Sequence, residues 1–157
     1  MARYYPVSPL FWSDVGVQQW GDREKLLALY LLTCEHRNLE GLYRLPHSYI
    51  AEDLGWELED VRKAMQRLIE AGFIRYDEAS RVVFVCRALK YQAPKSARQV
   101  KGAIASLQEV PDTPLLDDFL QAAERWAPEL YEALVGLADS DSNGYRDGSE
   151  RRLRAVI

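Results

Sequence analysis

The side chains of this sequence best suited to binding a ligand are Lys and Arg residues in a stretch that contains no acidic residue. Residues 79–108 carry six Lys or Arg side chains and no Asp or Glu. The stretches on either side are acidic: residues 21–78 hold eight bases against twelve acids, and residues 109–157 hold five bases against eleven acids. The overall net charge of −4 therefore hides a positive stretch that attracts phosphate locally.

The positive stretch is densest where a helix is expected to begin. Ser96 and Gln99 have the spacing of a capping box. Four cations surround this start, here called the basic cluster: Lys90, Lys95, Arg98 and Lys101. Phosphate oxygens bind such side chains and the free amides of a helix N-terminus. We expect the basic cluster to bind DNA phosphates; the alternative is that it docks on acids of the same chain, such as Asp117 and Asp118.

A helix expected over residues 57–71 carries a second set of candidate DNA contacts. Its apolar residues recur at helical spacing, and the opposite face presents four polar side chains: Arg62, Lys63, Gln66 and Arg67. The N-terminal end, which meets base edges in a recognition helix, carries Glu57, Glu59 and Asp60. We interpret these acids as stabilising the helix dipole. The exposed face either contacts DNA one turn later or forms i,i+4 pairs, such as Lys63 with Glu59.

Arg75 and Arg81 are the last two candidate DNA contacts, on a hairpin expected over residues 73–86. They flank Asp77 and Glu78, which stand where many such hairpins carry Arg or Lys. The two arginines either reach phosphate or neutralise these acids. The second strand is apolar on both faces, so one face should cover the core and the other should meet the C-terminal helices or a second subunit.

Catalytic and metal-binding patterns are not found in this sequence. His36 and His47 lack metal-like spacing with the cysteines, and no Gly-rich phosphate loop is present. Cys34 and Cys86 lie in apolar runs, which is typical of buried, reduced thiols. No signal peptide is seen, and no window approaches the roughly 20 apolar residues of a membrane helix. We expect a cytoplasmic protein that is not an enzyme, has no cofactor or metal and does not bind membranes.

The pattern of elements predicts a mainly α-helical fold with a small β-hairpin. After an irregular aromatic lead, we expect a helix starting at an Asp22 N-cap, a short strand at residues 41–45, a helix at residues 47–54 closed by Gly55, the helix at residues 57–71 and the hairpin. This order is that of a winged helix-turn-helix, followed by further helices from Ser96, Thr113 and Pro128. Trp12 and Trp20 are predicted to be core anchors, and His47 a surface residue.

A family resemblance covers residues 11–92. It rests on FWSD, EKLLALYLLTC, NLEGLYRLPHSYIAEDLG, the hairpin and ALKYQ. Together these resemble the N-terminal winged-helix domain of phage and prophage replication-initiation proteins, the DnaD-like replisome organisers. The resemblance implies DNA binding near an origin or bridging to the helicase-loading machinery, with self-association. The Tyr…Ile…Trp signature of that family's second domain is not found, and Trp56-Glu57 stands where its recognition helix usually has a Ser or Thr cap.

The sequence thus predicts a winged-helix domain at residues 1–92, a helical extension packing on it at residues 93–138 and a disordered tail at residues 139–157. The favoured function is a DNA-binding or scaffolding module of phage-type replication initiation, with duplex or single-stranded DNA, a second copy and helicase-loading or replication proteins as partners. The alternatives are a winged-helix transcriptional regulator and a protein-interaction module without DNA binding.

Overall fold

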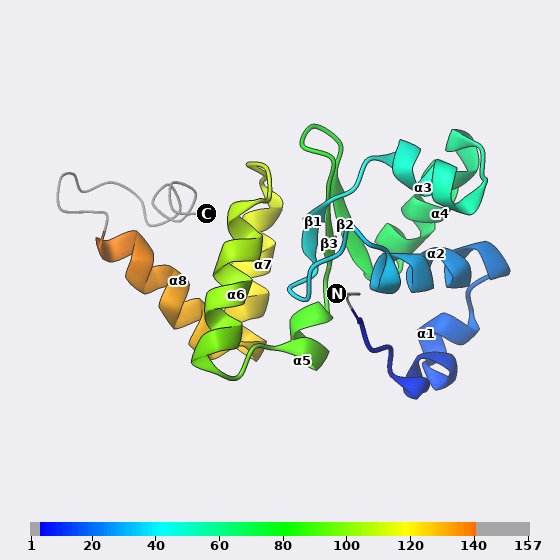
Figure 1. Ribbon diagram of the computed structural model, residues 1–157. Coiled ribbons are helices and arrows are strands. Elements are labelled where there is room, and N and C mark those ends of the chain that lie inside the picture. The colour runs from blue at the N-terminus through cyan, green and yellow to red at the C-terminus, as the bar shows by residue number, and fades with distance from the viewer. Residues whose placement is uncertain (1–3, 141–157) are drawn as a thin grey trace.

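The protein is described by a computed structural model in which residues 4–140 are placed (Figure 1). Its elements follow in this order: η1 (Pro9–Ser13), α1 (Val15–Gln18), α2 (Asp22–Thr33), β1 (Leu42–Arg44), α3 (His47–Leu54), α4 (Leu58–Glu70), β2 (Ile74–Asp77), β3 (Val82–Val85), α5 (Ala88–Gln92), α6 (Ala97–Gln108), α7 (Leu115–Trp126) and α8 (Pro128–Ser140). The fold is mainly helical with a small antiparallel sheet, and the run from α2 to β3 has the order of a winged helix. The predicted fold class is confirmed.

Several element boundaries follow from local signals in the sequence. Helix α3 begins and ends where predicted, because Gly55 takes the left-handed conformation (φ 65°) that ends the helix. Helix α4 is one residue shorter at each end than expected. The N-cap of α2 is Gly21 rather than Asp22, which lies inside the first turn. The lead is not irregular, since η1 and α1 form there, and α5 was also not expected.

Strand β3 is the centre of the sheet, which has the order β1-β3-β2. Leu42 of β1 pairs with Phe84, and Ile74 of β2 pairs with Val85, both antiparallel. All four residues of β3 are buried, because each face of the strand packs against a different layer of helices.

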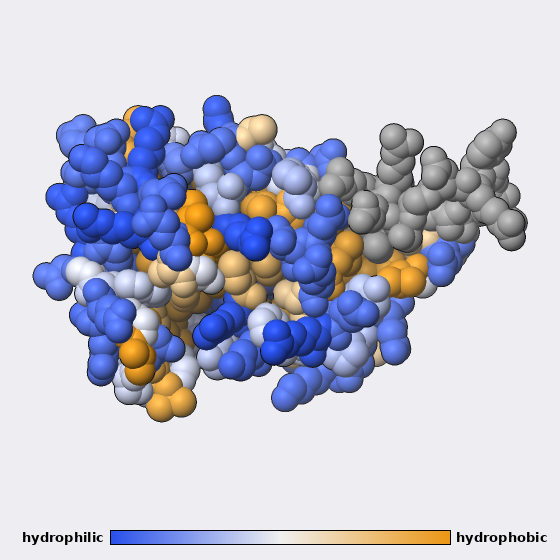
Figure 2. Space-filling model, turned by 180° about the vertical axis from the view of Figure 1, so that it is seen from behind, coloured by the Kyte–Doolittle hydropathy of each residue, from blue (hydrophilic) through white to orange (hydrophobic). Residues whose placement is uncertain are grey.

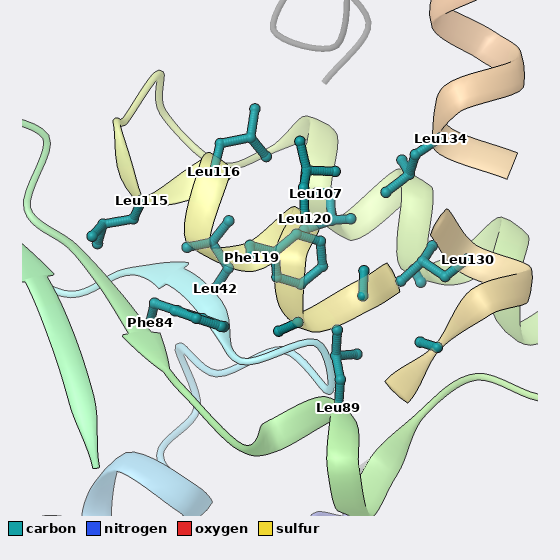
Figure 3. Close-up of a cluster of buried hydrophobic side chains, with 14 of the residues drawn as sticks. Leu42, Phe84, Leu89, Leu107, Leu115, Leu116, Phe119, Leu120, Leu130 and Leu134 are labelled. Carbon is teal, nitrogen blue, oxygen red and sulfur yellow. The ribbon is translucent and has the colours of Figure 1, made fainter. Parts of the chain in front are cut away.

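The two faces of the sheet carry two apolar clusters. Val83 and Val85 belong to the cluster formed with α2, α3 and α4. Val82 and Phe84 belong to the cluster formed with α6, α7 and α8, where the rings of Phe84 and Phe119 pack in a T-shaped arrangement with centroids 6.0 Å apart (Figure 3). The second face of β3 was expected to meet either the C-terminal helices or a second subunit. The C-terminal helices cover it.

Trp12 and His47 differ from the predictions made for them, whereas Trp20 agrees with its prediction. Trp12 is not a core anchor, because 58% of it is exposed on η1. Trp20 does pack on the core, in a T-shaped contact with Phe73 whose ring centroids are 5.3 Å apart. His47 is not a surface residue, since the hairpin covers it and only 9% of its side chain is exposed. Helix α8 reaches Ser140, and the rest of the predicted tail lies outside the described residues.

Candidate nucleic-acid interface

The four side chains of the basic cluster are exposed on α5 and at the start of α6. Lys90 lies on α5, 5.5 Å from the ring centroid of Tyr91. Lys95 precedes α6, while Arg98 and Lys101 project from its first turns. No salt bridge joins any of the four to another residue within 4–140. Asp118, one of the acids considered as their intramolecular partner, lies 3.5 Å from Arg75 instead.

The start of α6 is closed by its own side chains. The predicted capping box is present: the Gln99 amide donates to Ser96 Oγ (3.2 Å) and the Ser96 amide donates to Gln99 Oε1 (3.2 Å). The Lys95 amide also donates to Gln99 Oε1, at 2.9 Å. Three amides at this end are therefore already bonded, which leaves the cationic side chains as the main groups here that a phosphate would meet.

The polar face of α4 is largely paired with acids of the same chain. Lys63 lies 3.8 Å from Glu59. Gln66 donates to Glu70 at 3.1 Å. Arg67 donates to Glu24 at 2.5 Å. The expected i,i+4 pair of Lys63 with Glu59 thus forms, and the charge that α4 offers to DNA is reduced.

Glu24 is the acid that holds Arg67, and only 3% of it is exposed. Burial by itself raises the pKa of this carboxyl. The hydrogen bond from Arg67, together with backbone amide bonds, outweighs burial, so the pKa lies below its ordinary value. Glu24 therefore stays ionised at neutral pH and holds Arg67 against α2. The sequence did not suggest this pair, because the two residues are 43 positions apart.

The hairpin tip is tied to the C-terminal helices. Asp77 accepts hydrogen bonds from the hydroxyl and amide of Ser80, which lower its pKa, and Thr113 Oγ1 donates to it at 3.2 Å. Arg81, at φ 58°, is exposed at the tip. Arg75 points toward α7 and pairs with Asp118. Arg81 thus lies at the exposed tip and Arg75 lies against α7. Neither forms a salt bridge with Asp77 or Glu78 among the described residues.

His47, predicted from the sequence to be a surface residue, is instead a buried group beside this tip. Its ring stacks on Tyr76 with centroids 4.6 Å apart, and its Nε2 lies 3.9 Å from Glu78. Nε2 has no hydrogen-bond partner among residues 4–140. Burial lowers the pKa of His47, with nearby Arg62 acting in the same direction and Glu78 opposing it. A His directly after a proline gives no signal of burial, since only the fold brings the hairpin over it.

The predicted contacts form two separate sets in space. Helix α4 lies on one side of the sheet and α6 on the other (Figure 1). The basic cluster and the α4 face are therefore two candidate sites rather than one continuous surface, and Arg75 belongs to neither.

Comparison with known proteins does not assign the chain to a family: no protein-family model matches it, and no significant match was found among curated proteins or solved structures. Within residues 4–140, no three His, Cys, Asp or Glu side chains are grouped so that they could hold a metal ion. The same residues contain no helix that is long and apolar enough to span a membrane.

Proposed function

We propose that this protein is a DNA-binding and scaffolding module of phage-type replication initiation, and that the basic cluster makes its main phosphate contacts. The observation that carries the proposal is the cluster itself. Four exposed cations around one helix start have no salt-bridge partner among the described residues, in a chain whose net charge is −4. The link to replication rests on the resemblance of residues 11–92 to DnaD-like replisome organisers.

Binding through such a cluster reads charge rather than base sequence. Each phosphate that a Lys or Arg neutralises releases counterions, so the logarithm of affinity falls with the logarithm of salt by about 0.9 per contact. Four contacts then predict a loss of about a hundredfold in affinity between about 50 and about 200 mM salt. Duplex and single-stranded DNA both fit this mode, since neither base edges nor a groove are required.

The α4 face plays the smaller part in this proposal. Arg62 of α4 and Arg81 of the hairpin tip form no salt bridge with a described residue, whereas Lys63 and Arg67 of α4 are paired. Glu59 and Asp60 occupy the first turn of α4, the part that would enter the major groove. A transcriptional regulator that reads bases through α4 is therefore less favoured than a scaffold that holds DNA by its backbone.

One observation favours a second candidate, a protein-interaction module without DNA binding. Lys63 and Arg67 of α4 are paired with acids of the chain, and Thr113 holds the hairpin tip at Asp77. Both parts that a winged helix normally presents to DNA are thus engaged within the chain. In this alternative the fold binds a helicase-loading protein or a second copy.

The deciding experiment measures DNA binding by fluorescence anisotropy with labelled duplex and single strands, at about 50 and about 200 mM salt. The variants are Lys90→Gln/Lys95→Gln/Arg98→Gln/Lys101→Gln and a matched α4 variant, Arg62→Gln/Lys63→Gln. We expect the cluster variant to lose binding and the α4 variant to keep most of it. Equal loss in both would contradict the assignment to the cluster. No binding by the unmodified protein at low salt would favour the interaction module.

A further inference from the structure

A groove of about 700 Å³ runs between α7 and the sheet, at the end of α4. One wall comes from α4, β2 and β3, and the other from a single stripe of α7 that includes Asp118, Gln121 and Arg125. Its size lies within the range typical of binding pockets. Helix α7 lies behind α6 in Figure 1, and Figure 2 views the molecule from that side: apolar surface lies exposed there between hydrophilic residues across the middle of the face.

The groove carries one guanidinium on each wall. Arg75 comes from β2 and Arg125 from α7. Asp118 pairs with Arg75 at 3.5 Å, with 60% of the Arg75 side chain exposed. Two cations and one acid leave the groove with a net positive charge. At 3.5 Å, and with Arg75 largely exposed, the pair of Arg75 with Asp118 leaves Arg75 able to donate to a second carboxylate. The remaining polar group of the α7 wall, Gln121, is neutral.

Trp126 decides which kind of anionic partner the groove suits. Its ring is already covered by the guanidinium of Arg125, 5.1 Å from the ring centroid. A nucleic-acid base needs an open aromatic face on which to stack, and Arg125 occupies one face of this ring. A guanidinium over a ring still has N–H donors to offer, and their fork geometry matches a carboxylate. Ile69, which is partly buried, adds apolar wall beside the two cations.

We propose that this groove binds an acidic peptide segment of a partner protein, with Arg75 and Arg125 holding two of its carboxylates and an apolar side chain of the segment lying against Ile69. Charge complementarity selects the segment, and the apolar wall rejects a purely polar one. Because the two walls belong to different layers of the fold, a bound segment ties the C-terminal helices to the sheet. The site shares no residue with the basic cluster, so the proposal stands or falls independently of DNA binding.

The experiment is a selection from a displayed library of random peptides against the unmodified protein, with Arg75→Gln/Arg125→Gln as the counter-selecting variant. Both side chains lie at the groove surface, and circular dichroism checks that the variant folds. We expect enriched peptides to combine Asp or Glu with an apolar residue. Each enriched peptide is then made with a fluorophore, and its affinity should fall about 10- to 100-fold in the double variant. The control Arg98→Gln removes a cation outside the groove and should leave the affinity unchanged.

Cys86 gives an independent readout, because it lines the groove and carries a free thiol, while Cys34 is buried elsewhere. An enriched peptide should slow the alkylation of Cys86, read by mass spectrometry, and leave Cys34 unaffected. Three results would overturn the proposal: no enrichment of acidic peptides, equal affinity in the double variant, or protection of Cys86 by an oligothymidine but by no peptide. The last result would assign the groove to single-stranded nucleic acid.

Discussion

A single contact changes the role expected for Arg67. By sequence it is an exposed cation on a candidate recognition helix, and 67% of its side chain is indeed exposed. Its guanidinium nevertheless bonds to Glu24, a buried acid on α2. Arg67 therefore stabilises the packing of α2 on α4, and we expect its contribution to DNA binding to be small.

Glu24 makes the stability of the protein depend on acid pH. Its pKa in the folded state lies below the ordinary value of 4.5, so its stabilising effect is present above that value and is lost as the pH falls through the folded pKa. Glu24→Gln should lower the free energy of unfolding by about 1 kcal/mol at neutral pH. It should also flatten the decline of that energy between about pH 5 and about pH 3.

Urea unfolding followed by circular dichroism at several pH values measures both effects. Asp22→Asn is the matched control, because Asp22 lies in the same first turn but is exposed. An unchanged pH dependence in Glu24→Gln would show that the pair with Arg67 does not set it.

Residue types and spacing predicted which side chains of the candidate sites are exposed, but not their pairs with residues far away in the sequence. The capping box at Ser96 and the pair of Lys63 with Glu59, one of the two alternatives for that face, depend on neighbours within a few residues, and both are present. The bonds of Glu24 with Arg67 and of Asp77 with Thr113 join residues far apart in sequence. A single sequence carries no periodic signal for such contacts, which exist only once the layers have packed.

At the scale of the elements, Gly41 sets the entry into β1. It has a φ of 78°, and a Cβ built on it would overlap that of Ala88 and lie 3.2 Å from the carbonyl oxygen of Val85. No side chain fits there, because α5 and the end of β3 close over the backbone. This close approach holds α5, and with it Lys90, against the sheet.

Gly41→Ala should therefore lower the free energy of unfolding by about 3 kcal/mol, since backbone strain and overpacking add. Gly72→Ala is the control: it has a similar φ of 73° but nothing within 4 Å of the new Cβ, so about 1 kcal/mol of strain is expected. Thermal unfolding of the two variants separates the cost of backbone strain from the cost of the contact with Ala88. Equal losses would mean that the contact with Ala88 is relieved by a small shift of α5.

The elements with clear start and stop signals were predicted best. Gly55 and Gly72 mark the ends of α3 and α4, and the expected bounds of α4 differ from the observed ones by one residue at each end. Helices η1, α1 and α5 have only four or five residues, too few for an apolar period to be seen. The exposure of Trp12 was missed for the same reason, because its direction depends on the turn of η1.

For the whole molecule, β3 is the feature that joins the two halves. Alternate residues of this four-residue strand enter the two apolar clusters. Neither cluster can open without exposing side chains of the same strand. We therefore expect the described part of the chain to unfold in one transition, in spite of its two cores.

Phe119→Ala tests this coupling from the far side of the sheet. Phe119 is fully buried in the cluster of α6, α7 and α8, and its loss should lower the free energy of unfolding by about 3–5 kcal/mol. Cys34, buried in the other cluster, should then be alkylated faster, with the rate following the global stability. Mass spectrometry distinguishes Cys34 from Cys86. An unchanged rate at Cys34 would show that the two halves open separately.

The central place of β3 also governs how slowly its backbone exchanges hydrogen with solvent. Its amides are bonded within a sheet whose faces are both covered, so no local fluctuation of a loop or helix end releases them. The amide of Val85, which donates to the Gly41 carbonyl at 2.7 Å, would exchange only when the whole molecule opens. A single slow amide in this strand would thus report the stability of both halves at once.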